Sequence, residues 1–301
     1  MVSQALLPVL TLVFSLVSAS PAPVQVRQAI TTLSTAQIDV FTPYAFFANT
    51  GYCSPSTTMS WTCGGIKPGF IPFATGGDGS DIQFFFVGYD PSLNAVIVSH
   101  QGTDPEEIEA DLTDLDFSLT ALNPSLFPGV SSSVEVHNGF GDEQAMTAPT
   151  ILAAVQQAMS EHGTNSVTTT GHSLGAALSL LDALYLKVQI PSASVKFIGF
   201  GLPRVGNQAF ANLIDSTFPG LVTHINNKLS IPHPRNLCAG EFLGFVHPSG
   251  ENHIMDSNAW VACPGQDNPS TECTTGDVPN IFDGTLSDHD GPYNGVTMGV
   301  C

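Results

Sequence analysis

The sequence predicts an α/β fold in which a central, mostly parallel sheet is flanked by helices. Three observations predict it: strand-like and helix-like segments alternate through the middle of the chain, one strand is an apolar run, and another strand passes directly into a helix. Such alternation is typical of parallel strands joined by crossover helices, which then cover both faces of the sheet.

The first expected elements lie before residue 101. The stretch from Ser34 to Gly51 opens with a capping-type residue and carries apolar residues at helical spacing, which predicts a helix on the core. Residues 81–100 predict two strands around the turn sequence YDPSLN. Because the second strand, NAVIVSH, is an apolar run, we expect it to be buried on both faces.

The alternation continues toward the C-terminus. A segment rich in Ala, Met and Gln predicts a helix from Gly139 that ends at Gly163. The β-branched strand SVTTT runs straight into GHSLGAALSLLDALYLK, which is strongly helical. A strand over 195–201, a helix over 204–218 and a strand over 221–228 follow. The C-terminal third is expected to be irregular, apart from hairpin positions around His247 and His253.

Acidic side chains dominate the charge of the chain. Lys and Arg total 7 against 26 Asp and Glu, which gives a formal net charge of -19. A chain this acidic repels phosphate backbones and anionic lipid surfaces at long range, so we expect no nucleic-acid partner. A neutral substrate fits better.

The N-terminal segment predicts secretion. An apolar run from Leu6 to Val17 is followed by small residues, which indicates a signal peptide over residues 1–19. The run is too short for a membrane span, which needs about 20 apolar residues, so no integral membrane segment is expected. Residues 20–33 are expected to be a short propeptide or a flexible N-terminus, and residues 34–301 to form one enzyme domain.

Six cysteines in an exported chain predict disulfide bonds. Two pairings are expected: Cys263 with Cys273, which closes a short polar loop, and Cys301 with either Cys53 or Cys63, which ties the ends together. Cys238 is left without an obvious partner.

GHSLG places a serine between a strand and a helix, where a nucleophilic serine stands in a sharp turn. The turn needs glycine two residues either side of Ser173, because strand and helix approach too closely there for larger side chains. At the N-terminus of the helix, the amide of Leu174 is placed to donate to an oxyanion. The alternative is a serine that only caps an ordinary helix.

A second oxyanion donor is expected from a loop after an earlier strand. In VIVSHQGTDP, Thr103 follows Gly102 directly after the buried strand, so its amide could point at the reacting carbonyl oxygen. An ordinary Gly-Thr turn is the alternative for this segment alone. The Gly-Thr segment precedes the GHSLG motif in the chain, as a hydrolase requires, so the two motifs support each other.

The segments VIVSHQGTDP, VTTTGHSLGAALSLL and FIGFGLPRVGNQAFA together resemble the class 3 lipase family of secreted α/β-hydrolases, from about Ser34 to the C-terminus. The resemblance implies an α/β-hydrolase fold, with Thr103 and Leu174 as the two halves of the oxyanion hole. It also implies that the segment EEIEADLTDLDFSL forms a lid.

The resemblance places the catalytic histidine near the C-terminus, a few residues before a tyrosine. SDHDGPYNG therefore assigns His289 as the general base and later general acid, with Tyr293 following. His172 is expected to make packing or lid contacts. The acidic residues beside His289 have no metal-loop spacing, so we expect a solvated acidic turn and no metal site.

The acid of the expected catalytic triad is missing from its family position. That position lies three residues before a proline on the loop after the strand LVTHINNK, and here the residue is Leu229. Another carboxylate could substitute, with Glu241, Asp215 and Asp256 as candidates. We favour a mispredicted splice junction over about 229–241, because family-like sequence resumes beyond it; the third alternative is a genuine loss of the acid.

The sequence thus predicts a secreted serine carboxylic-ester hydrolase, most similar to triacylglycerol lipases, that works through an acyl-enzyme. This chemistry needs no cofactor. We expect an ester substrate, with a lipid–water interface as one setting, and a monomer. The alternatives are an esterase for feruloyl or other soluble esters, which a polar lid would suit, and a catalytically impaired protein of the same fold that binds lipid or glycan.

Overall fold

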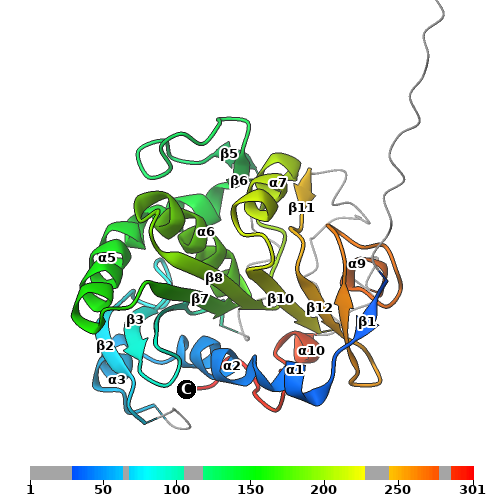
Figure 1. Cartoon of the computed structure of the whole chain (residues 1–301), viewed down its shortest axis with the longest axis horizontal. Helices are drawn as coiled ribbons and strands as arrows, with labels where there is room; N and C mark the ends of the chain where they lie inside the picture. The colour runs from blue at the N-terminus through cyan, green and yellow to red at the C-terminus, as the bar shows by residue number, and fades with distance from the viewer. Residues whose placement is uncertain (1–28, 64–67, 105–117, 228–243, 278–285) are drawn as a thin grey trace, which may run out of the picture.

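A computed structural model describes residues 29–63, 68–104, 118–227, 244–277 and 286–301. Within these residues, a nine-stranded sheet runs through the molecule in the order β1-β13-β12-β10-β8-β7-β4-β3-β2 (Figure 1). Its strands are β1 (Thr31–Thr32), β2 (Ile71–Gly76), β3 (Phe85–Asp90), β4 (Ala95–His100), β7 (Ser166–His172), β8 (Ser194–Phe200), β10 (Val222–Asn227), β12 (Glu251–Ile254) and β13 (Trp260–Cys263).

The five central strands of this sheet are parallel. β4 pairs with β7, β7 with β8, β8 with β10 and β10 with β12, all in the same direction. Antiparallel strands extend the sheet on both sides. The predicted mostly parallel sheet is confirmed, and the carboxyl ends of its five central strands share one edge.

Helices cover both faces of the sheet. On one face lie α5 (Asn138–His162), α6 (Leu174–Gln189) and α7 (Gln208–Thr217), and on the other lie α1 (Thr35–Asp39), α2 (Thr42–Thr50) and α10 (Leu286–His289) (Figure 1). The remaining helices are α3 (Pro55–Ser60) and α9 (Thr274–Asp277). Each face has its own buried apolar cluster, one around Val98 and Leu181, the other around Phe86 and Ile97. Among the described helices, none is both long and apolar enough to cross a membrane.

A smaller sheet lies beside α7, above the main one in Figure 1. Its described strands are β5 (Leu119–Ala121), β6 (Glu135–His137), β9 (Gly206–Asn207) and β11 (Phe245–Val246), in the order β11-β9-β6-β5. The sequence did not predict it. Its strands are only two or three residues long, too short for an apolar alternation to show.

Two of the expected helices differ from their predicted bounds. The helix expected over 34–51 is two helices, α1 and α2, because Pro43 in the first turn of α2 lacks the N–H that a continuous helix would need. The helix expected over 204–218 starts at Gln208, where the Asn207 side chain accepts a hydrogen bond from the Phe210 amide at 2.9 Å. By contrast, α5 ends at Gly163 as predicted, with φ +63° at that glycine.

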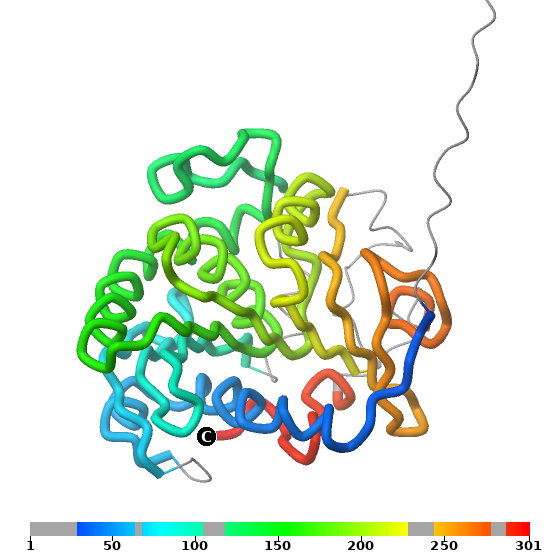
Figure 2. Tube along the Cα trace, in the orientation of Figure 1, coloured from blue at the N-terminus to red at the C-terminus, as the bar shows by residue number. Residues whose placement is uncertain are grey.

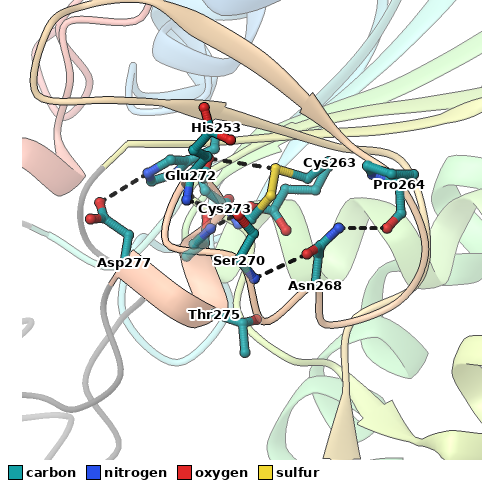
Figure 3. Close-up of a disulfide and its surroundings, with 12 residues drawn as sticks. His253, Cys263, Pro264, Asn268, Ser270, Glu272, Cys273, Thr275 and Asp277 are labelled. Carbon is teal, nitrogen blue, oxygen red and sulfur yellow. Dashed lines mark hydrogen bonds and ion pairs between the residues drawn. A yellow bond between two sulfur atoms is a disulfide. The ribbon is translucent and has the colours of Figure 1, made fainter. Parts of the chain in front are cut away.

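The C-terminal third is more regular than expected. β12 adds a parallel strand to β10 and forms a hairpin with β13. Figure 3 shows the short loop beyond β13, where the Nε2 of His253 lies 3.0 Å from a carboxylate oxygen of Asp277. The Thr274 hydroxyl lies 3.0 Å from the Nδ1 of the same histidine. His253 is therefore held in the core, in line with the hairpin position expected for it.

Disulfide bonds join Cys263 with Cys273 and Cys53 with Cys301. The first pairing is confirmed, and the second settles on Cys53 as the partner of Cys301. Cys63 is buried and forms no disulfide bond with another described cysteine, and Cys238 lies outside the described residues. The bond between Cys53 and Cys301 holds the C-terminus beside α2 (Figure 2), where the Asn49 side chain also donates to the Val300 carbonyl at 2.8 Å.

Candidate active site

Ser173 stands in the sharp turn between β7 and α6. Its φ of +56° and ψ of -127° fall in a region that residues other than glycine rarely adopt. The side chain is 1% exposed, and its Oγ has no hydrogen-bond partner among the described residues. A strained backbone and an unengaged hydroxyl are what the turn that presents a nucleophilic serine requires.

The two glycines around Ser173 are required by space. A Cβ on Gly171 would overlap the backbone of Gly175, and a Cβ on Gly175 would overlap the carbonyl oxygens of His100 and Gln101. The expected close approach of strand and helix is therefore present. It also brings the end of β4 against the first turn of α6.

The loop after β4 lies directly beside the serine. A Cβ on Gly102 would lie 3.1 Å from the Cβ of Ser173 and would overlap the His172 carbonyl oxygen. Thr103, the next residue, is half-buried. The structure thus places the segment of Gly102 and Thr103 beside the turn of Ser173 and Leu174. The expected lid lies mostly within residues 105–117, outside the described residues.

His289 ends the short helix α10 and is fully buried. Its ring centroid lies 4.6 Å from that of His172. A Cβ on Gly201, at the end of β8, would lie 2.7 Å from the Cε1 of His289, so that glycine leaves the space the ring occupies. The histidine from the C-terminus and the serine turn therefore meet at the carboxyl edge of the parallel strands.

Two side chains hold the backbone of His289 by its carbonyl oxygen. His172 lies 2.9 Å away through its Nε2, and the Tyr293 hydroxyl donates at 2.8 Å. The Nδ1 of His172 lies 2.6 Å from the Tyr52 hydroxyl. Because a carbonyl only accepts, the network assigns the hydrogen of His172 to Nε2, and Nδ1 accepts from Tyr52.

The electrostatics of this network favour a neutral His172. Burial lowers its pKa well below the usual range, and the neighbouring His289 lowers it further. A neutral imidazole fits the assigned hydrogen bonds. The sequence motif revealed His172 only as a packing residue, and nothing in the sequence around Tyr52 indicated its role.

The candidates for the triad acid lie in different places. Leu229 and Glu241 are outside the described residues. Asp215, on α7, accepts hydrogen bonds from the Ser249 amide at 2.8 Å and from its hydroxyl at 2.7 Å, so the structure does not bring it to His289. Asp256 is exposed and follows β12 at the edge where the loop after β10 begins, since Asn227 pairs with Ile254.

One acidic neighbour of His289 is not solvated as expected. Burial raises the pKa of Asp290 to about 6, and its Oδ1 has no hydrogen-bond partner among the described residues. This carboxyl also contributes, after burial, to the raised pKa of Tyr52. Asp290 is half-buried, so the expected solvated acidic turn is only partly solvated at this residue. The C-terminal segment packs against it there, and the Met298 amide donates to its backbone carbonyl at 2.8 Å.

Metal-type ligands gather in two places among the described residues. One group is Cys53, Cys63 and Cys301, and the other is Glu251 with Cys263 and Cys273. Both contain a disulfide, so four of these five sulfurs are bonded to one another and are not thiolates. Neither group offers three free ligands.

The fold and the turn at Ser173 define an α/β-hydrolase of the ester-hydrolase class. A family model described as lipase (class 3) matches residues 97–235. The secreted mono- and diacylglycerol lipase MDL3 of Malassezia globosa is 32% identical over 299 residues, covering 95% of this chain and 92% of its own length. The chain belongs to the class 3 lipase family.

Solved structures of fungal lipases share the fold. The triacylglyceride lipase of Rhizomucor miehei superimposes with a TM-score of 0.75 and 24% identity, over 90% of this chain and 99% of its own. Lip2 lipase of Yarrowia lipolytica gives a TM-score of 0.74 at 25% identity, over 91% and 98% of the two chains. The predicted family, fold and secreted ester-hydrolase class are confirmed.

Proposed function

We propose that Ser173 and His289 make this secreted protein an acylglycerol hydrolase that works through an acyl-enzyme, within a domain spanning residues 34–301. The observation that carries the proposal is the strained turn at Ser173, which meets His289 and the Gly102–Thr103 loop at one edge of the sheet. The relatives named as mono- and diacylglycerol lipases support partial glycerides as the first substrates to test.

The proposed chemistry begins when the Oγ of Ser173 attacks the ester carbonyl carbon and His289 takes its proton. The amides of Thr103 and Leu174 donate to the oxyanion that forms on the former carbonyl oxygen. His289 then gives the proton to the departing glycerol oxygen. Water, activated by the same histidine, releases the fatty acid and restores the serine.

Tyr293 and His172 have a supporting part in this proposal. By holding the backbone carbonyl of His289, they fix the backbone position from which the imidazole side chain extends. The triad acid is missing from its family position, so no carboxylate is identified that would orient His289. We expect that the anchored histidine alone still supports slow hydrolysis. Loss of the acid costs about 10⁴-fold in kcat in serine proteases, and activity still remains well above water.

The test compares monoacyl-, diacyl- and triacylglycerols with a feruloyl ester, each below and above its solubility limit. We expect hydrolysis of partial glycerides and a rate that rises once an interface forms. A preference for soluble aryl esters without that rise would favour the esterase alternative. Binding of lipid without any hydrolysis would favour the non-catalytic alternative.

A further inference from the structure

A buried pair of side chains lies beneath the Gly102–Thr103 loop, and the proposed mechanism does not use it. His100 is the last residue of β4, and Asp182 lies on α6, the helix that begins just after Ser173. The His100 Nε2 and a carboxylate oxygen of Asp182 are 2.7 Å apart, and both side chains are 0% exposed. This is an acid–base pair set wholly inside the core.

The hydrogen bonds around the pair assign its state. The side-chain amide of Gln144, on α5, donates to the other oxygen of Asp182 at 2.9 Å. Both oxygens of Asp182 then accept, as a carboxylate does, and the Nε2 of His100 carries the hydrogen between the pair. The Nδ1 of His100 has no partner among the described residues.

The pair joins the two elements that carry the proposed oxyanion donors. β4 leads into Thr103, and α6 begins at Leu174. Near Ser173 the two backbones touch, because Gly175 leaves no room for a Cβ against the carbonyl of His100. The His100–Asp182 hydrogen bond is a second attachment, about 10 Å further along α6 than Gly175 by helical rise.

Two attachments fix a direction as well as a separation. The sheet already holds the end of β4, because His100 pairs with Phe85 of β3 and with Gly171 of β7. The side-chain hydrogen bond adds a direct connection from this strand end to a point further along α6, and so opposes a rotation of the helix against the sheet. On the other side of the loop, Gln101 is held to the residue just before β3, since its amide donates to the Phe84 carbonyl at 2.8 Å and its side-chain oxygen accepts from the Phe84 amide at 3.0 Å.

We propose that the His100–Asp182 pair positions the oxyanion hole, by setting the loop that carries the Thr103 amide against the helix that carries the Leu174 amide. The inference rests on the proposed function of that site. An oxyanion is stabilised only while both donors stand about 3 Å from it, and the loss of one donor costs about 10²–10³-fold in kcat. Both residues are positioning residues, because neither touches the substrate.

Stability alone does not account for the pair. A buried, hydrogen-bonded polar pair is often no more stabilising than apolar residues of similar volume, because both groups must be taken out of water. An apolar pair would therefore suffice to fill this part of the core. The position of the pair at the base of the loop is explained by a role in placing the oxyanion donors, which packing alone does not explain.

The decisive variant is His100→Leu combined with Asp182→Ala, which nearly keeps the summed side-chain volume and removes the hydrogen bond between the two residues. We expect its melting temperature to fall by a few degrees, because the buried Gln144 amide loses its acceptor. At a temperature well below that transition, its kcat should fall at least about tenfold and its KM should change less than about twofold. Inactivation by an organophosphonate ester, whose phosphoryl oxygen occupies the oxyanion hole, should slow by the same factor.

Two further variants serve as controls. Asp182→Asn should retain most of kcat, because His100 can move its hydrogen to the unpartnered Nδ1 and accept from the new amide at Nε2. Val155→Ala, on the buried face of α5, should lower the melting temperature and leave kcat unchanged. A double variant with wild-type kcat, or one whose kcat falls only as its melting temperature falls, would overturn the proposal.

Should the double variant fail to fold, Gln144→Met decides, because it removes only the second donor to Asp182. It should lower kcat about threefold at constant KM, and an unchanged kcat would overturn the proposal. Failure of the proposed function would look different: the wild type itself would neither hydrolyse esters nor react with the phosphonate at Ser173.

Discussion

The serine side and the histidine side of the candidate site are built in different ways. On the serine side, backbone contacts and glycines decide the geometry, and most of the residues involved lie within 171–175. On the histidine side, α10 is a short helix, and the His289 carbonyl is held by Tyr293, four residues further on, and by His172 from the serine turn. Tyr52, from a third segment, in turn holds His172. A steric constraint within a few neighbouring residues is hard to lose, whereas a network across the chain can be weakened one bond at a time.

The largest expected effect is on the serine side. Ser173→Ala removes the nucleophile, so kcat should fall by about 10⁶-fold where the triad acid is present, as in a chain that also carries Leu229→Asp. In the chain as written, where the acid is already missing, the fall should be about 10²-fold, because the residues of a triad act as a unit. Hydrolysis of a partial glyceride measures it, with circular dichroism to show an intact fold. Ser179→Ala, on the same helix, is the matched control and should keep the rate. Residual wild-type activity in Ser173→Ala would place the nucleophile elsewhere.

The next largest effect concerns the missing acid. Leu229→Asp should raise kcat by up to about 10⁴-fold, because a carboxylate there would orient His289 and stabilise its protonated form. Leu229→Asn is the matched control and should give no such gain. Sequencing the cDNA across codons 225 to 245 shows in parallel whether the loop is encoded as written. No gain from aspartate would mean that the acid comes from another position.

A smaller effect is expected from the anchoring of His289. His172→Phe removes the donor to the His289 carbonyl, so kcat should fall about tenfold, the scale of one buried hydrogen bond, while KM stays constant. Tyr52→Phe leaves that donor in place and should cost less. Because burial keeps the pKa of His172 low, the loss should be the same from pH 6 to pH 8. Equal losses for both variants, or a rise in KM, would contradict this anchoring.

The smallest effect is on stability. The pKa of Asp290 is raised to about 6 from its ordinary 3.8, so the folded state holds its proton more tightly than the unfolded state. The free energy of unfolding should therefore fall as the pH rises from about 4 to about 6. Asp290→Asn should melt at a higher temperature than the wild type at pH 7, and the difference should vanish below about pH 4. A difference that does not depend on pH would exclude this cause.

The sequence predicted the serine side because its causes are local. Gly171, Ser173 and Gly175 stand together in one motif, and the apolar run before Gly102 marked a strand buried on both faces. The break between α1 and α2 was also local, since Pro43 marks it, but a continuous apolar spacing hid it. Edge strands such as β2, whose pairing with β3 is interrupted by a bulge after Pro72, lack the regular alternation of apolar and polar residues from which a strand is predicted.

The histidine side could be predicted only in part. His289 was predicted from its spacing to Tyr293, yet the contacts of Tyr52 and His172 join segments more than a hundred residues apart. The pair of His100 and Asp182 is hidden for the same reason, because each stands in a segment that reads as apolar core. Long-range hydrogen bonds leave no period in the sequence, so only the folded arrangement reveals them.

The account is tested most directly by mapping where an organophosphonate ester attaches. The protein is incubated with the phosphonate, digested, and searched by mass spectrometry for the modified peptide. We expect one adduct, on Ser173, formed more slowly in His289→Ala and at an unchanged rate in Ser179→Ala. An adduct on another residue, or no adduct in a protein that hydrolyses partial glycerides, would contradict it.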